Sequence, residues 1–382
     1  MKRLLITGGR AAAALELARL FRAAGWRVVV AESLPWHPSR WSRAVARSYV
    51  IPWPNRDPPG CIDALRHIIQ TERIDLLIPT CEEIFTIAKG YEHLAPYCTV
   101  FAENIDKLHR LHSKWLFVQT AQRHRLAAPP TILLTNPEEA QQALASGRDL
   151  VFKPVYSRFA AHTVVRPRTR AELPAAVSER RPWVAQDYVP GRQICTYSVA
   201  HTGRLTVHSA YLAEFTFGLG AAVAHAALDH PTSRAWVEAF VRAERFTGQM
   251  AFDFIETPDG RLFAIECNPR TTSGVHLFAD DAAFVPAFLG ETAHPLQPRR
   301  GRASMYALLM AAQLPRSVRS WRRFRRWGAA ILGARDVFFR GDDLWPFIGQ
   351  FLTFAALHRR ARRFGVSLTE ASTLDIEWNG DR

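Results

Sequence analysis

The chain has 382 residues, of which 48% are hydrophobic, and its 49 basic and 35 acidic residues give a formal net charge of +14. A chain of this length can bury a large core and should form two or three folded units. Its five cysteines include no CxxC pair, which argues against a disulfide framework or a zinc site and fits a reducing cytoplasm. We find no internal repeat, low-complexity tract or signal peptide, and expect a cytoplasmic protein.

The N-terminal residues have the pattern of an α/β nucleotide-binding fold. Residues 3–7 predict a buried strand, Gly8 and Gly9 a turn, residues 11–24 a helix, and residues 27–31 the next strand. This succession is Rossmann-like, but the three spaced glycines of a dinucleotide site are absent. A nicotinamide site is therefore not favoured.

Two acidic residues follow the next predicted strand. Residues 74–79 read as a further parallel strand, and Glu82 and Glu83 come shortly after it. Ligands of open α/β sheets bind outside the carboxyl ends of the strands. Glu82 and Glu83 are therefore candidates to bind a substrate amine, although they could instead complement the dipole of the helix that they begin.

A predicted hairpin brings oxygen donors together further along the chain. Residues 250–256 alternate like a half-buried strand, residues 257–260 read as a turn, and residues 261–265 as the returning strand. Asp253 and Glu266 then lie on neighbouring strands, with Asn268 on the same face. Two carboxylates and an amide oxygen suit Mg2+, or Mn2+, shared with nucleotide phosphates. The simpler interpretation is a surface hairpin with a polar rim.

Cationic residues accompany these donors. Arg270 lies at the same edge, where it could stabilise transferred phosphate. Only five of the 49 basic residues are lysines. Lys153 ends a short apolar run and is followed by a proline, so a strand should deliver its ammonium group into a site. Lys114 lies in a probable helix, where a solvated lysine and a functional one are equally compatible with the pattern.

The order of these pieces resembles the ATP-grasp superfamily of carboxylate–amine (or thiol) ligases, in particular its carbamoyl-phosphate-synthetase-like and D-alanine–D-alanine-ligase-like members. The resemblance covers residues 1–295. Five pieces match in family order: Lys114 and Lys153 as the two nucleotide lysines, residues 127–131 as the entry to a strand, residues 184–191 as the hinge that holds adenine, and Asp253, Glu266 and Asn268 as metal ligands.

The resemblance implies the fold and its division. We expect an α/β protein with a Rossmann-like domain over residues 1–105 that helps to bind the acceptor substrate. An ATP-grasp domain of two α+β subdomains, with the nucleotide between them, should follow over residues 106–295. Residues 296–382 should form an Arg-rich helical extension.

The resemblance also assigns nucleotide contacts, with two departures from the family pattern. In the hinge, Gln186 should bond the exocyclic amine of adenine beside Asp187, Tyr188 and Val189. Gln193 stands where the family usually places an acidic residue on the ribose. Residues 155–163 contain no glycine, although the family closes a glycine-rich loop over the phosphates. We expect a different loop shape, with Arg158 replacing backbone donors.

The implied reaction is ATP-dependent ligation. The γ-phosphoryl group of ATP would pass to a substrate carboxylate, and an amine would displace phosphate from the acyl phosphate to leave an amide. Lys153 and Arg270 would be the catalytic residues. Two alternatives remain open: a phosphotransferase of the same fold, and a non-catalytic or membrane-associated binding protein on a decayed ligase scaffold.

The C-terminal region carries much of the positive charge. From residue 302 onward there are 14 arginines and 7 acidic residues, and an apolar run over residues 344–357 separates two arginine clusters. The run is too short to span a bilayer. We favour a helical extension with its arginines in solvent and its aromatic residues buried against the chain or a second subunit of a homodimer; these aromatic residues are Trp345, Phe347, Phe351 and Phe354. Peripheral contact with an anionic membrane is the alternative, and nucleic acid is not expected.

Overall fold

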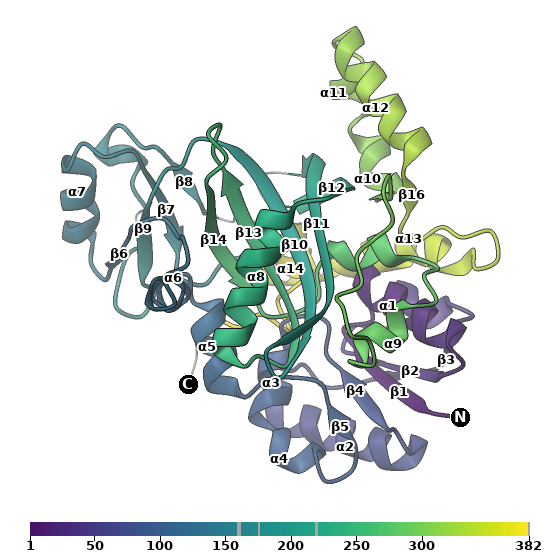
Figure 1. The fold of residues 1–382 in the computed structure, drawn as a ribbon. Coiled ribbons are helices and arrows are strands. Elements are labelled where there is room, and N and C mark those ends of the chain that lie inside the picture. The colour runs from purple at the N-terminus through teal and green to yellow at the C-terminus, as the bar shows by residue number, and fades with distance from the viewer. Residues whose placement is uncertain (159–161, 175, 218–220, 381–382) are drawn as a thin grey trace.

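The computed structural model describes residues 1–158, 162–174, 176–217 and 221–380, and it contains three sheets (Figure 1). Residues 159–161, which belong to the predicted phosphate loop, lie outside the described residues.

The N-terminal domain is built on a five-stranded parallel sheet, as the Rossmann-like pattern predicts. Its strand order is β3-β2-β1-β4-β5. The chain adds β2 and β3 on one side of β1 and then crosses to the other side of β1 to add β4 and β5, so the order of strands switches between β1 and β4. A crevice at such a point, outside the carboxyl ends of the strands, is the usual ligand site of open α/β sheets. The elements are β1 (Arg3–Thr7), α1 (Ala12–Ala23), β2 (Arg27–Glu32), η1 (Pro38–Trp41), β3 (Val45–Val50), α2 (Pro58–Glu72), β4 (Leu76–Ile78), α3 (Glu83–Lys89), α4 (Tyr91–Leu94) and β5 (Thr99–Val100).

The second unit is a small antiparallel sheet of strand order β6-β9-β7-β8. The apolar side chains of one face of this sheet pack with α7 and form a core separate from that of the first domain. The elements are α5 (Ile105–His112), α6 (Lys114–Arg123), β6 (Thr131–Leu134), α7 (Pro137–Ala145), β7 (Leu150–Pro154), β8 (Val164–Val165), η2 (Arg170–Glu172) and β9 (Trp183–Asp187).

The third unit is a seven-stranded sheet of order β14-β13-β10-β11-β12-β15-β16. Stacked and edge-to-face rings of Trp236, Phe240, Phe252 and Phe254 fix helix α8 on one face of it. The elements are β10 (Arg192–His201), β11 (Arg204–Phe217), β12 (Ala221–Leu228), α8 (Pro231–Glu244), β13 (Gly248–Glu256), β14 (Leu262–Asn268), η3 (Ser273–Phe278), α9 (Phe284–Phe288), β15 (Ala303–Met305) and β16 (Arg335–Asp336).

The region predicted as a helical extension is more closely integrated than expected. Its strand β15 pairs with β12 and so extends the large sheet. Figure 1 shows α11 and α12 projecting away from the sheets, whereas α13 lies along the N-terminal domain. None of the described helices combines the length and apolar character needed to cross a membrane. The helices are α10 (Ala307–Ala312), α11 (Leu314–Ser317), α12 (Trp321–Gly333), α13 (Trp345–Phe364) and α14 (Leu368–Ala371).

Of the four aromatic residues of α13 that we expected to be buried, only Phe347 is half-buried against the chain, and the expectation is wrong for the other three within this chain. Burial against a second subunit stays a prediction. The helix rests on η1 through its small residues, and Gly349 approaches Trp41 so closely that an added Cβ atom would lie 2.5 Å from the ring. The opposite face is open, with Trp345 58% and Phe351 56% exposed. Only small side chains fit at the close contact between α13 and η1, so most of the large apolar side chains of α13 lie on its exposed face.

The arginines of this region also divide into two groups. Arg322 and Arg323 on α12 are exposed, as predicted for a solvated charge run. Arg360 on α13 is buried and pairs with Asp375, so the expectation of solvent-exposed arginines is wrong there. A buried guanidinium group requires such a carboxylate partner, and the chain supplies it from beyond α14.

Candidate active site

Strands β13 and β14 bring the predicted oxygen donors together. Asp253 lies directly opposite Glu266 in the antiparallel register, and a β-bulge follows Asp253. The side-chain amide of Asn268 donates to Glu266 Oε1 at 3.1 Å, so the three side chains share one face. The intervening Cys267 is buried in the core on the other face. The predicted hairpin is confirmed, together with the face that each of its residues occupies.

The electrostatics of this pair favour a bound cation. Desolvation in the cleft, and then the charge of Glu266, raise the pKa of Asp253. Desolvation opposes ionisation of Glu266 as well, but the charges of Lys114 and Lys153 outweigh it and lower the pKa of Glu266. Two adjacent carboxylates that disfavour each other's charge, with an amide oxygen beside them, fit a hard divalent ion such as Mg2+.

The amide oxygen of Asn268 is the third oxygen donor that we predicted for this site. Within the described part of the chain, no three His, Cys, Asp or Glu side chains gather in a way that could hold a metal ion. The oxygen Oδ1 of Asn268 accepts from Arg270 Nη2 at 3.2 Å. Metal binding through Asn268 would therefore replace this contact with Arg270.

Both predicted nucleotide lysines reach the carboxylate pair from other elements. Lys114 is the first residue of α6, which Ser113 caps by accepting from the Leu116 N–H. The Lys114 Nζ lies 3.4 Å from Glu266 Oε2 and donates to the Ser157 carbonyl at 3.2 Å. Lys153 is buried on β7, where desolvation lowers its pKa to about 8. Because the buried Lys153 ammonium group has few partners within the protein, it can bind an anion.

A cavity of about 230 Å³ opens beside these groups. Its walls come from both antiparallel sheets, so a ligand there would lie between them. The lining side chains include most of the predicted nucleotide residues and both carboxylates, namely Lys114, Lys153, Gln186, Asp187, Tyr188, Val189, Gln193, Asp253 and Glu266.

Gln186 differs in detail from the expectation. Its Oε1 accepts from Lys153 Nζ at 3.0 Å, and its Nε2 donates to Thr131 Oγ1 at 3.2 Å. The side-chain amide is therefore occupied on both sides, and it orients Lys153 instead of facing an adenine amine. The Asp187 carboxylate likewise pairs with Arg148. The N–H groups of Asp187 and Tyr188 donate to carbonyls of neighbouring segments at 2.9 and 2.8 Å. This leaves the Val189 N–H, with the carbonyls of this stretch, as the part of the hinge that can bind a base edge.

Arg158 lies elsewhere than predicted. Its guanidinium group binds the Glu82 carboxylate and donates to the carbonyl of Trp378 at 2.8 Å, away from the cavity lining. The physical reason is that Glu82 is buried at the end of β4 and requires a cation. No sequence pattern near Arg158 indicates this partner, which is 76 residues away.

The two glutamates at the end of β4 have different roles. Burial opposes ionisation of Glu82, but Arg158, His112 and Arg270 lower its pKa to about 2, and Arg270 Nη2 lies 3.8 Å from Glu82 Oε1. Glu83 instead accepts from the Thr7 hydroxyl and the Thr80 N–H, and so joins the ends of β1 and β4. Glu82 thus faces the predicted catalytic arginine, whereas Glu83 accepts its hydrogen bonds from residues at the ends of the sheet strands.

Several buried polar atoms at this junction have no hydrogen-bond partner among the described residues. They are Glu82 Oε1, His112 Nε2, Ser157 Oγ and Arg270 Nε. Buried polar atoms are nearly always paired, so a cluster of exceptions points to a ligand or ordered water. The sequence interpretation missed His112 and Ser157. The only indication of them in the sequence is their position along the chain, because His112 lies close to Lys114 and Ser157 directly precedes Arg158.

Comparisons with protein-family models and with curated proteins find no match. Among solved structures, N5-carboxyaminoimidazole synthetase from Staphylococcus aureus in complex with ADP is 14% identical over 80% of this chain and 82% of that chain, with a TM-score of 0.63. L-amino acid ligase from Bacillus licheniformis is 17% identical over 79% and 78%, with a TM-score of 0.59.

A third match is the biotin carboxylase domain of 2-oxoglutarate carboxylase from Hydrogenobacter thermophilus, in complex with MgADP, ADP and bicarbonate. It is 12% identical over 79% of this chain and 73% of that chain, with a TM-score of 0.61. The chain has the ATP-grasp fold. The predicted ATP-grasp fold is thereby confirmed, whereas the predicted domain bounds stay a prediction. The cavity lies between the four-stranded and the seven-stranded sheet.

Proposed function

We propose that the protein is an ADP-forming ligase that joins a small-molecule carboxylate to a small-molecule amine. One observation carries the proposal: two buried lysines and the Asp253–Glu266 pair face a single cavity between the two sheets of an ATP-grasp fold. The named structural relatives support it, since they include an amino acid ligase and complexes with ADP and MgADP. The five free cysteines suit a reducing cytoplasm.

The cavity offers a place for each part of ATP. The backbone of residues 187–189 would bind the adenine edge, and Gln193 the ribose hydroxyls. Lys114 and Lys153 would hold the phosphates by charge-assisted hydrogen bonds. Asp253, Glu266 and Asn268 would hold Mg2+, which supplies charge neutralisation for the phosphates when bound.

The reaction would proceed in two displacements. A substrate carboxylate oxygen attacks the γ-phosphorus of ATP, and the bond from that phosphorus to the bridging oxygen breaks to release ADP. The amine nitrogen then attacks the acyl carbon, the bond to the phosphate oxygen breaks, and the amine loses a proton to solvent. Positioning and charge neutralisation carry the rate, so the chain needs no covalent nucleophile.

Two residues at the far end of the cleft would act on the acyl group and the amine. Arg270 would stabilise the charge of the acyl phosphate. Glu82, whose pKa is lowered to about 2, would bind the N–H groups of the amine and not remove its proton. Because Arg270 and Glu82 are neighbours, the two reacting groups would meet between them.

The test is ADP release measured over a panel of acids and amines. A ligase releases ADP at a substantial rate only when both partners are present, and mass spectrometry detects the amide. ADP release with an acid alone, and no amide, would indicate the phosphotransferase alternative. No ADP release with any pair would contradict both activities and favour a binding protein on this fold.

A further inference from the structure

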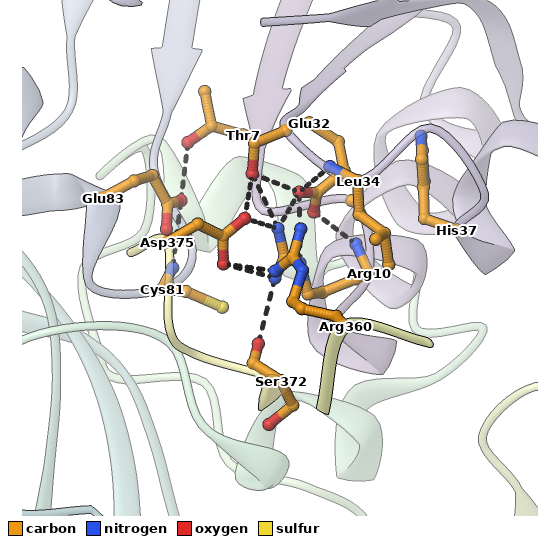
Figure 2. Close-up of polar contacts among 12 residues, drawn as sticks. Thr7, Arg10, Glu32, Leu34, His37, Cys81, Glu83, Arg360, Ser372 and Asp375 are labelled. Carbon is orange, nitrogen blue, oxygen red and sulfur yellow. Dashed lines mark hydrogen bonds and ion pairs between the residues drawn. The ribbon is translucent and has the colours of Figure 1, made fainter. Parts of the chain in front are cut away.

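The residues that follow α14 fill the crevice between β1 and β4. The segment 372–380 crosses the carboxyl ends of these two strands, where an acceptor substrate of an open α/β sheet would lie. Figure 2 shows Asp375 of this segment directed at Arg10, which follows the turn after β1. The crevice is therefore closed by the chain itself.

Asp375 places a carboxylate in a cationic pocket. It is fully buried and accepts from Arg10 Nη1 at 2.8 Å and Nη2 at 2.6 Å. Arg360 Nη1 lies 2.8 Å from its Oδ1, and the Ser33 hydroxyl donates to it. Arg10 also pairs with Glu32 (Figure 2), so two cations are balanced by two carboxylates.

Trp378 places its backbone N–H donor on Glu82, the residue proposed to bind the substrate amine. Its backbone N–H donates to Glu82 Oε2 at 3.0 Å, and its carbonyl accepts from Arg158. Its ring stacks on Phe85 with centroids 5.2 Å apart. The segment thus offers an anion to Arg10 and an N–H to Glu82, and Glu82 is the group next to Arg270.

We propose that the 372–380 segment imitates the acceptor substrate, and that this acceptor is an amine that carries a second, anionic group. The anionic group, a carboxylate or a phosphate, displaces Asp375 from Arg10 and Ser33, while the amine takes the place of the Trp378 N–H on Glu82. Three residue steps separate Asp375 from Trp378, so their Cα atoms lie at most about 11 Å apart, and the two groups of the substrate should span a distance of that order or less. This inference rests on the proposed ligase function.

Displacement of Asp375 from Arg10 should require the anionic group of the substrate, because the charges in this buried site must stay balanced. If Asp375 leaves alone, Arg10 and Arg360 remain near a single carboxylate, and an uncompensated charge in a buried site is strongly unfavourable. An incoming anion restores the balance. A neutral amine cannot do so, and the segment then stays in place.

The experiment uses the full chain and two variants that loosen the segment by different means. Asp375→Asn removes the anion, and Trp378→Ala removes the ring on Phe85 without changing a buried charge. Asp342→Asn, which alters an exposed aspartate of the same region, is the matched control. Peptide-level hydrogen exchange of residues 374–380 and the KM for the amine are measured for each protein.

Hydrogen exchange of the wild-type segment should accelerate about fivefold or more with β-alanine, whose anion is a carboxylate, or with O-phosphoethanolamine, whose anion is a phosphate. It should remain unchanged with ethanolamine, an amine without an anionic group, at equal ionic strength. A response to only one of the two acidic amines identifies the anionic group as carboxylate or phosphate. Both loosening variants should exchange faster without ligand and lower the KM for the acidic amine several-fold, with the KM for ATP unchanged. Asp342→Asn should match the wild type.

Two results would overturn the inference. One is equal exchange of residues 374–380 with β-alanine, O-phosphoethanolamine and ethanolamine. The other is ligase activity whose amine KM is the same in both loosening variants as in the wild type; the ligase function would then stand without a substrate-like segment. Conversely, anion-dependent exchange in a protein that releases no ADP supports the crevice as an anion site and contradicts only the ligase function.

Discussion

The nucleotide cleft and the region after residue 295 both contain buried charged groups, but they satisfy them differently. In the cleft, Lys153 and the Asp253–Glu266 pair face an open cavity, and nearby polar atoms lack partners within the described chain. In the C-terminal region, Arg19 pairs with Asp343, and Arg340 pairs with Glu16. Closed ion pairs specify how the chain packs, whereas incompletely paired charges beside a cavity indicate a ligand.

The strongest test of this comparison is deletion of residues 302–382. The deletion removes β15 and β16 from the large sheet and leaves the buried Arg10 and Arg19 without their C-terminal carboxylates. An unpaired buried charge costs several kcal/mol, so we expect an insoluble protein. Expression and sedimentation measure this outcome. A soluble, fully active truncation would show that the region is an appendage, as expected of an interfacial membrane helix.

Lys153→Ala should have the largest effect of any single substitution in the cleft. It removes a charge-assisted contact to phosphate, and turnover should fall by about 10²-fold or more. Circular dichroism should show an intact fold, because the lysine side chain binds only Gln186 among the described residues. The matched control is Lys2→Ala at an exposed lysine, which should keep wild-type turnover. Unchanged kinetics at position 153 would remove our placement of the nucleotide.

Glu266→Gln and Asn268→Ala test the metal site of the cleft. Each removes one oxygen ligand or its charge, so the Mg2+ concentration for half-maximal ADP release should rise by about tenfold or more. Excess Mg2+ should restore part of the rate. Activity that proves independent of divalent ions, after treatment with a chelator, would show that these residues do not hold a metal.

Acid should affect the two regions in different pH ranges. Burial lowers the pKa of His112 in the cleft to about 3. Below pH ~6.5, therefore, this histidine binds a proton in the unfolded chain but stays neutral in the folded chain. The free energy of unfolding should fall there, by at most about 1.4 kcal/mol per pH unit from this residue. For Asp375, burial favours the neutral form, but Arg10 lowers the pKa to about 2, and its contribution is lost only below pH ~4.

Denaturant unfolding from pH 7 to pH 3 measures these contributions. His112→Gln should reduce the slope of this curve between pH ~6.5 and ~3 by the contribution of one histidine. The buried His37, His208 and His225, whose pKa values are also lowered by burial, keep a residual slope in both proteins. Equal slopes in wild type and His112→Gln above pH 4 would contradict a neutral, buried His112.

The smallest effect on stability is expected at the exposed face of α13. Phe351→Ser alters a side chain that is 56% exposed, so the free energy of unfolding should change by about 0.5 kcal/mol or less. If this face contacts a second subunit or an anionic membrane, the substitution should weaken self-association or vesicle co-sedimentation instead. A loss of several kcal/mol in the monomer would show that α13 packs in solution through its aromatic face.

The parts of the site that could be predicted lie in local patterns. The strand, turn and returning strand around Asp253 and Glu266 fix which residues face each other, because side chains alternate along a strand. Lys153 was predictable because its apolar run becomes β7. Gln186 lines the predicted cavity, but its side-chain partner could not be predicted, and Arg158 was misplaced. Each binds a charged group from a distant element, Lys153 and Glu82 respectively.

The sequence by itself determined the parallel N-terminal sheet, the hairpin of oxygen donors and the strand that carries Lys153, since periodicity and turn residues act over a few positions. Only the tertiary structure decided what becomes of the charges near residue 375. The Arg10–Asp375 pair joins residues 365 positions apart, and no local pattern records it. Burial makes such a pair obligatory once the chain has folded, because neither charge can stay unpaired away from water.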